Sequence, residues 1–227
     1  MGKPLNIFIV YAHHEPASFT AAMKNAAIQN LERQGHSVVV SDLYGQGFSA
    51  VAQKWDFVTT SGGHFNYMLE QKHSAQLGNA FSPDILSEIQ KLQVAEALLI
   101  ITPLWWSSVP AILKGWFDRV LAMGVAWDSG RIYENGLMHG KQAMLAVAGG
   151  HPAGYYTPEG RQLATAQQVL HHINHDTLAF CGFNVQEPYI ALNILGMNQE
   201  ERDKALHDWS QRAQSLVSSP LWLSFYG

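Results

Sequence analysis

Apolar runs of strand length alternate along the chain with segments whose apolar residues recur at helical spacing. The expected strands cover residues 5–12, 37–43, 97–101, 142–148 and 185–193, and the expected helices cover residues 18–33, 82–95, 110–123, 159–179 and 199–217. Because strands separated by helix-length segments form right-handed βαβ units, we predict an α/β protein. The expected core is a doubly wound, five-stranded parallel sheet with helices on both faces.

The segment after the second expected strand, residues 45–79, departs from this alternation. It is rich in Gly and Ser but carries aromatic residues such as Trp55 and Phe65, so we interpret it as a long excursion rather than a linker. Gly45-Gln46-Gly47 opens a segment with the form of a dinucleotide-binding fingerprint. No amphipathic helix and no suitably placed acidic residue follow, so we predict a loop there.

Composition narrows the possible classes of protein. With 227 residues, 47% of them hydrophobic, the chain is expected to form one domain over residues 1–227. The net charge of −4 favours no nucleic-acid partner. No apolar run approaches the roughly 20 residues of a membrane span, so no membrane insertion is expected. The single cysteine, Cys181, excludes an internal disulfide and fits a reducing, cytoplasmic location.

Three loops follow expected strands, at residues 13–20, 103–108 and 149–156. In an open parallel sheet the carboxyl ends of the strands lie at one edge, and ligands bind outside that edge. We therefore predict that the three loops converge on one site.

The first loop runs from a strand end into a helix N-terminus. Ser18 is expected to cap the helix, and the free amides of Phe19 and Thr20 together with the helix dipole predict an anion site. His13 could add a further donor. The alternative is an ordinary helix cap beside surface histidines.

The other two loops suit a planar ligand. Trp105 and Trp106 lie beside the backbone groups of the 103–108 turn, an arrangement that favours a flavin ring. Gly149-Gly150 permits close backbone approach, and Tyr155 or Tyr156 could donate a hydrogen bond to the ligand. The alternatives are indoles that lock the next helix to the sheet, and a glycine turn beside a packed tyrosine.

Three histidines, His171, His172 and His175, lie on one expected helix and include a pair at i, i+4. No carboxylate-rich or cysteine segment is seen to complete a catalytic metal site, so we expect a solvated or interface helix and no metal. No G-x-S-x-G motif for acyl transfer is present, and Cys181 has the apolar neighbours of an inert thiol.

Taken together, these segments resemble the NAD(P)H:quinone oxidoreductases, and also the bacterial reductases that accompany glutathione-gated potassium efflux. The likeness covers most of the chain. The residues that carry it are Tyr11-Ala12-His13 with Ser18-Phe19, Ser41-Asp42-Leu43-Tyr44, Ser82-Pro83-Asp84-Ile85, the run from Val109 to Val120, Gly149-Gly150, Phe180-Cys181-Gly182-Phe183 and Glu187-Pro188.

The resemblance implies a flavodoxin-like homodimer with one flavin per site at the subunit interface, FAD with FMN as the alternative. His13, Ser18, Phe19 and Thr20, assisted by Asn66, would hold the flavin phosphates. The isoalloxazine ring would be flanked by Pro103, Leu104, Trp105, Trp106, Ser107, Ala148, Gly149 and Gly150. Asp118 and Arg202 would lie near the adenine of FAD. The quinone pocket would be lined by Trp127, Ile132 and Phe180.

The chain departs from the family pattern around this implied site. Trp105 stands where the family usually has a glutamine. The catalytic tyrosine of the family aligns with Tyr155 or Tyr156, but the histidine that partners it in the animal enzymes falls on Arg161 or Gln162. We therefore hypothesise that Arg161 or solvent stabilises the negative charge that hydride transfer creates.

The function implied is two-electron reduction of quinones by NAD(P)H as co-substrate, in a ping-pong hydride transfer. The alternative is a flavin-bound regulatory subunit of a glutathione-gated potassium efflux system, which would co-purify with its transporter. A flavodoxin-type electron carrier is disfavoured because such carriers are usually shorter and more acidic.

Overall fold

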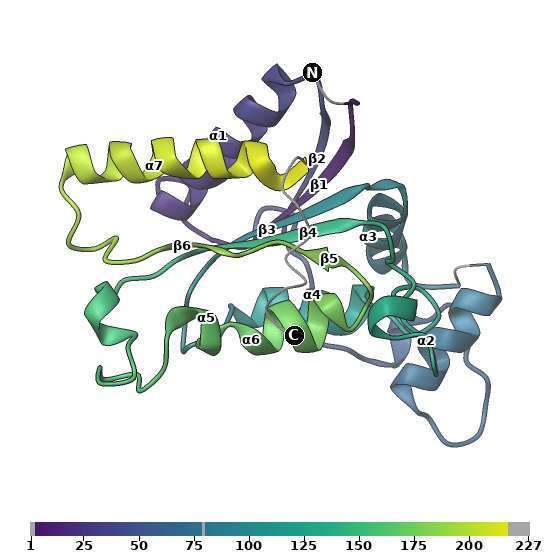
Figure 1. The fold of residues 1–227 in the computed structure, drawn as a ribbon. Coiled ribbons are helices and arrows are strands. Elements are labelled where there is room, and N and C mark those ends of the chain that lie inside the picture. Colours follow the sequence, from purple (N-terminus) through teal and green to yellow (C-terminus); the bar gives the residue numbers. More distant parts are fainter. Residues whose placement is uncertain (1–2, 79, 218–227) are drawn as a thin grey trace.

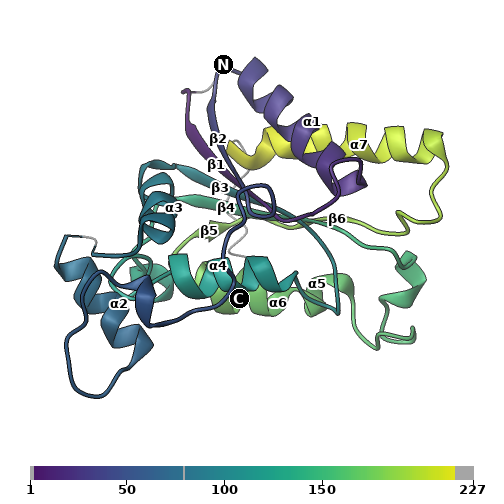
Figure 2. The same ribbon diagram turned by 180° about the vertical axis from the view of Figure 1, so that it is seen from behind.

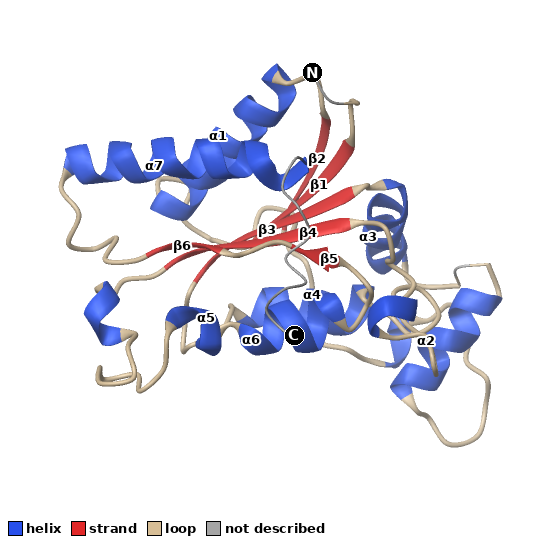
Figure 3. Cartoon of the chain, in the orientation of Figure 1, coloured by secondary structure: helices blue, strands red, loops and turns tan. Residues whose placement is uncertain are grey.

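The computed structural model describes residues 3–78 and 80–217, which form a layered α/β structure around one sheet (Figures 1 and 3). The strands are parallel and follow the order β2-β1-β3-β4-β5, with β6 also paired to β4. This order confirms the predicted doubly wound sheet. The described strands are β1 (Asn6–Tyr11), β2 (Ser37–Asp42), β3 (Ala97–Pro103), β4 (Gln142–Ala148), β5 (Asn184–Val185) and β6 (Tyr189–Ala191).

Helices cover both faces of the sheet. The described α-helices are α1 (Phe19–Arg33), α2 (Tyr67–Gln76), α3 (Pro83–Val94), α4 (Ala111–Val120), α5 (Ala166–Val169), α6 (His171–Ile173) and α7 (Gln199–Gln214). Helices α1 and α7 lie on one face, and α3, α4, α5 and α6 lie on the other, as both views show (Figures 1 and 2). None of the described helices is long and apolar enough to cross a bilayer.

Alternation along β1 explains the two layers. Ile7, Ile9 and Tyr11 pack into the core beneath α1 and α7, whereas Phe8 and Val10 pack into the opposite core. A strand buried on both faces needs apolar residues at every position, which is why these runs were recognisable in the sequence.

The fifth predicted strand, residues 185–193, is divided in two. Strand β5 pairs with the start of β4, and β6 pairs with its end. Pro188 lies in the gap and has no N–H to donate to the ladder, which accounts for the interruption.

The helix predicted over residues 159–179 begins later than expected. Residues 156–164 form turns and bends, and α5 starts after Thr165. The hydroxyl of Thr165 accepts the amide of Gln168 at 3.1 Å, and the Gln168 side chain accepts the amide of Thr165 at 2.8 Å. This capping box sets the helix start, and the sequence analysis overlooked it. Helix α6 then continues into a π-helical turn, Asn174–Ala179.

The excursion after β2 contains a helix, α2, that was not predicted. Asn66 caps it by accepting the amide of Leu69 at 3.2 Å. The excursion crosses α4 at Gly115, where an added Cβ would lie 2.2 Å from the carbonyl oxygen of Ala50. Gly45-Gln46-Gly47 forms a turn, as predicted for a loop.

Candidate functional site

A cavity of about 590 Å³ lies beyond the carboxyl ends of the strands. Its described lining includes two histidines but no aspartate, glutamate, lysine or arginine, and combines aromatic and apolar side chains with a few hydroxyl and amide groups. Four loops contribute, and three of them are those predicted to converge. The lining consists of His13, Ser18, Phe19, Thr20, Pro103, Leu104, Trp105, Trp106, Ser107, Ala148, Gly150, His151, Tyr155, Tyr156, Gln162, Ile194 and Leu195.

The loop after β1 forms one end of this first cavity. Ser18 has extended backbone and accepts the amide of Ala21 at 3.1 Å, as an N-cap does. Nδ1 of His13 accepts the amide of Glu15 at 3.0 Å, so the neutral ring carries its proton on Nε2. Burial, reinforced by the neighbouring His14, lowers the pKa of His13. The loop therefore joins a helix N-terminus to an uncharged imidazole donor, a setting that suits a phosphate.

The turn after β3 forms the aromatic wall. Trp105 and Ser108 exchange backbone hydrogen bonds of 3.0 and 2.9 Å, which closes the turn. Trp106 and Ser107 take positive φ values of 51° and 56°, an uncommon conformation for residues other than glycine. The Trp106 side chain is fully exposed, at 102%, although it lines the cavity. Its indole is therefore not covered by any other side chain of the described residues.

The turn is also hydrogen-bonded to helix α6, on the face of the sheet opposite α1 and α7. The Ser108 hydroxyl lies 3.0 Å from Nε2 of His172, whose Nδ1 lies 3.0 Å from the carbonyl oxygen of Val169. A carbonyl only accepts, so Nδ1 carries the ring proton and Ser108 donates to Nε2. These bonds fix the turn against α5 and α6.

The loop after β4 forms the third wall. A Cβ added at Gly149 would lie 2.9 Å from Cδ2 of Leu192, and one at Gly150 would lie 3.1 Å from Cδ1 of Leu195. Both contacts are with the ends of leucine side chains, so a larger residue at either position would displace side chains of the loop that follows β6. Of the two predicted catalytic tyrosines, Tyr155 is half-buried and Tyr156 is buried, and both line the cavity.

Four lining residues were not predicted as site residues: His151, which lies within the predicted 149–156 loop, Gln162, which was named only as a position aligned with the family's histidine, Ile194 and Leu195. The rule that loops follow strand ends could have found two of them, since Ile194 and Leu195 follow β6 at the same edge. His151 directly follows the predicted Gly149-Gly150 pair.

A second cavity, of about 570 Å³, holds other predicted site residues. Asp118, Trp127 and Phe180 line it, and the indole of Trp127 meets the ring of Phe180 edge-on at 5.4 Å. Asp118 is paired with Lys114 at 2.6 Å. Within one chain the predicted quinone pocket is therefore separate from the predicted flavin cradle.

The remaining predicted residues lie outside both linings. Asn66 is the exposed cap of α2, between two residues that line the second cavity. Arg202 donates to the carbonyl oxygen of Ile194 at 2.7 Å and so supports the rim of the first cavity. Ile132 is half-buried just before Tyr133, and Arg161 is exposed.

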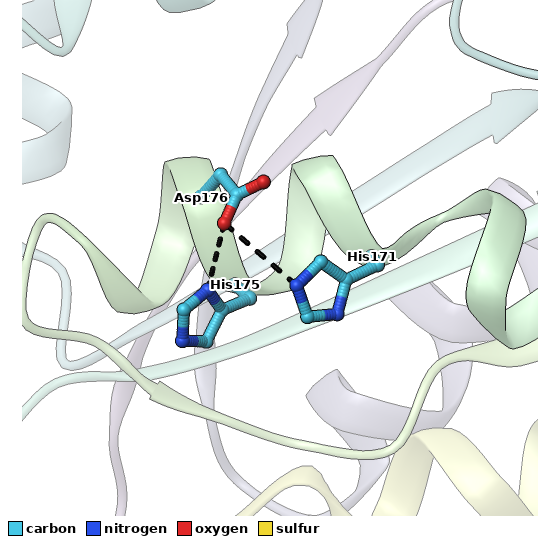
Figure 4. Close-up of side chains that lie close together, drawn as sticks. All are labelled: His171, His175 and Asp176. Atoms are coloured by element: carbon cyan, nitrogen blue, oxygen red, sulfur yellow. Dashed lines mark hydrogen bonds and ion pairs between the residues drawn. The ribbon is translucent and has the colours of Figure 1, made fainter. Parts of the chain in front are cut away.

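One cluster could in principle hold a metal ion. His171, His175 and Asp176 offer three ligand atoms within 4.8 Å of one another (Figure 4). An oxygen of Asp176 lies 2.7 Å from Nδ1 of His175 and 3.8 Å from Nε2 of His171. The sequence analysis did not recognise Asp176 as a carboxylate partner of the two histidines. The three side chains are exposed or half-buried, and Asp176 lines the second cavity rather than the first.

Comparisons with known proteins agree with this geometry. Residues 5–213 match a family model described as having a flavodoxin-like fold. The chain is also 41% identical over 212 residues to human ribosyldihydronicotinamide dehydrogenase (quinone), covering 92% of this chain and 91% of that protein. The chain belongs to the flavodoxin-like quinone oxidoreductase family.

Other members agree on this assignment. Rat NAD(P)H dehydrogenase (quinone) 1 is 35% identical over 219 residues, which cover 95% of this chain and 79% of that protein. A solved structure from Klebsiella pneumoniae, assigned as a quinone reductase, superimposes with a TM-score of 0.90 at 33% identity and covers 96% of this chain and 86% of that one. The family resemblance drawn from the sequence motifs is confirmed.

Proposed function

We propose that the protein is a flavoprotein oxidoreductase that reduces quinones with NADH or NADPH as hydride donor. The observation that carries this proposal is the aromatic-walled first cavity at the carboxyl edge of the sheet, whose described lining has no aspartate, glutamate, lysine or arginine, in a member of the quinone oxidoreductase family. A flat ligand with no net charge on its reacting part, such as a quinone, suits walls of this kind.

The residues of the first cavity fit a flavin. A flavin combines a planar ring with an anionic phosphate, and the cavity offers an aromatic turn at one place and a helix N-terminus at another. When bound, a flavin supplies the redox chemistry by accepting a hydride from the donor and passing two electrons to the quinone.

The chain's own residues would bind and orient the cofactor. Ser18, Phe19 and Thr20 present the first turn of α1 to the phosphates, and His13 adds its Nε2–H. The backbone of the 103–107 turn would meet the polar edge of the ring. Gly150 leaves room for that edge, while Trp105 and Trp106 would exclude water from its face.

We further propose that the cofactor is FAD and that a homodimer completes the site. Trp106 and Leu195 line the first cavity but are 102% and 83% exposed, and exposed apolar residues at a pocket rim mark interaction surfaces. The second cavity offers the complementary surface, with Trp127, Phe180 and the half-exposed Met68. A second copy would bring that cavity over the first.

This arrangement would also unite the residues expected near the adenine end of FAD. Arg202 supports the rim of the first cavity, whereas Asp118 lines the second. FMN, which has no adenine, would need neither, so separating released FAD from FMN by chromatography tests the choice. We retain a cytoplasmic location as part of the proposal, testable by fractionating the native cells.

Anaerobic stopped-flow absorbance tests the function. The flavin-loaded protein is mixed with NADH, NADPH or dihydronicotinamide riboside, because the names of the relatives differ in the donor. We expect at least one donor to bleach the flavin absorbance and benzoquinone to restore it. Absence of bleaching with every donor would contradict the proposal.

A further inference from the structure

The first cavity contains few groups that exchange a proton near neutral pH. Among its described lining residues, the titratable side chains are His13, His151, Tyr155 and Tyr156. Reduction of a quinone to a hydroquinone consumes one hydride and one proton. The proton must therefore come from one of these groups or from water.

Two of the four groups are poorly suited to this task. His13 lies beside the helix N-terminus, and burial lowers its pKa, so it is a neutral donor at the phosphate end. Tyr156 is 8% exposed, and burial, reinforced by Tyr155, raises its pKa further from neutrality. A general acid works best when its pKa lies near the working pH.

His151 has a different setting. It is exposed to solvent, lines the cavity and directly follows Gly150. Its ring stacks on that of Tyr155, with centroids 4.2 Å apart and planes within 9° of parallel. The backbone oxygen of His151 accepts the amide of Asn193 at 2.8 Å, so loops after β4 and β6 together fix its place.

The surroundings of His151 contain few other charges. The titratable groups on the turn packed against it are Tyr155 and Tyr156. The loop at residues 192–197 contributes none of its own, but Arg202 on α7 contacts it, donating to the carbonyl oxygen of Ile194 at 2.7 Å. Glu159 and Arg161 lie on the same connection after β4, and both are exposed. Gln162 lines the cavity in place of a second titratable side chain.

We propose that His151 is the general acid of quinone reduction, a role that rests on the proposed function. As the hydride reaches the quinone, a ring N–H of the His151 imidazolium breaks and its proton forms the new O–H bond on a quinone oxygen. The hydride brings both electrons, so the product is the hydroquinone and no further reductant is needed. The neutral imidazole then takes a proton from solvent, to which it is exposed.

The rate of quinone reduction tests this role. In His151→Gln we expect the bleaching of the flavin by the donor to stay within about twofold of wild type, while reoxidation by benzoquinone slows about 100-fold at pH 6.5. In wild type, reoxidation should slow as the pH rises, because the imidazolium that donates the proton is lost. In His151→Gln this pH dependence should disappear. His207→Gln, an exposed histidine on α7, is the matched control and should behave as wild type.

A second readout does not depend on turnover. In NMR spectra of protein labelled with ¹⁵N-histidine, the signal missing from His151→Gln belongs to His151. Its titration midpoint should match that of wild-type reoxidation and should shift when hydroquinone is added, whereas the His207 signal should not respond. Should His151→Gln fail to fold, His151→Asn takes its place in both measurements.

The outcomes separate the two proposals. If no donor bleaches the wild-type flavin, the proposed function fails and the role of His151 fails with it. If wild type turns over but reoxidation is independent of pH, or is unchanged in His151→Gln, the function stands and the assignment of His151 is overturned. A 100-fold loss confined to Arg161→Gln would likewise overturn it in favour of Arg161.

Discussion

The two cavities of the protein draw their walls from different parts of the fold. The first is built by loops that directly follow β1, β3, β4 and β6, so each wall is a few residues from a buried strand. The second is built by the excursion, α4 and the π-helical turn, and it includes the charged residues Lys114, Asp118 and Asp176. The ends of the strands place the loops of the first cavity, with side-chain contacts such as Ser108–His172 adding support, whereas the second cavity depends on long-range side-chain contacts throughout.

Those long-range contacts centre on one buried carboxylate. Asp56, which is fully buried, accepts hydrogen bonds from Arg119 at 2.8 and 3.1 Å and from the Tyr67 hydroxyl at 2.6 Å. Burial, together with the bond to Asp56, raises the pKa of Tyr67, so the phenol stays protonated and keeps donating. These bonds hold the excursion against α4. A substitution that breaks them should change the second cavity more than the first.

The largest effect is expected from Asp56→Ala. It leaves Arg119 buried with only Asp84, at 2.9 Å, as an acidic partner among the described residues. Breaking a buried ion pair typically costs about 3–5 kcal/mol, so the free energy of unfolding in urea should fall by about that amount. Quinone reduction should fall more than flavin content, because the excursion does not line the first cavity, where the flavin ring and phosphates are proposed to bind.

Lys204→Met is the control for this variant, since Lys204 is 75% exposed and pairs with Asp208 on the surface of α7. It should leave the urea midpoint almost unchanged. Equal losses of flavin content and quinone reduction in Asp56→Ala would show that the first cavity depends on the contacts of Asp56 as much as the second does.

A smaller effect, confined to the first cavity, is expected from Ser18→Ala. Loss of the N-cap should cost about 1 kcal/mol of stability and should also weaken flavin binding, because the same helix end faces the proposed phosphate site. Thr165→Ala removes a comparable cap, that of α5. It should cost similar stability and leave the flavin dissociation constant unchanged, as measured by fluorescence titration. Similar flavin affinity in both variants would argue against a phosphate at α1.

The smallest effect concerns Cys181. This thiol lies beside the second cavity, but it is 2% exposed and burial raises its pKa to about 12. At pH 8 only about one thiol in ten thousand is then ionised, so iodoacetamide should barely label the native protein and should label it once it is unfolded in urea. The labelling rate of the native protein should rise about tenfold with each pH unit and level off only near pH 12. Rapid labelling at pH 8 would show that the second cavity opens enough in the native protein to expose Cys181 to solvent.

The difference between the cavities also explains what could be predicted from the sequence. The sheet follows from apolar runs that stand out because the central strands β1, β3 and β4 are buried on both faces. Three of the four loops of the first cavity followed from those strands. The fourth directly follows the fifth predicted strand, residues 185–193, and was missed because the strand-end rule was not applied to that strand.

The second cavity could not be derived in this way. Its frame depends on Asp56 and Arg119, which are 63 positions apart, and no local pattern links them. Helix α2 was missed because its apolar residues do not form a clear stripe, and its cap, Asn66, was interpreted only as a flavin ligand. Its predicted lining residues, Asp118, Trp127 and Phe180, were expected from family resemblance alone.

The central claim is that a second copy's second cavity completes the first cavity as one quinone-reducing site. The most direct test mixes two inactive variants, Gly150→Val in the first cavity and Phe180→Ala in the second, by unfolding and refolding them together. Random pairing makes half of the dimers mixed, and each mixed dimer regains one unaltered site, so roughly a quarter of wild-type quinone reduction should return. If each site lay within one chain, the mixture would show no more activity than the two variants measured separately, and the account would be contradicted.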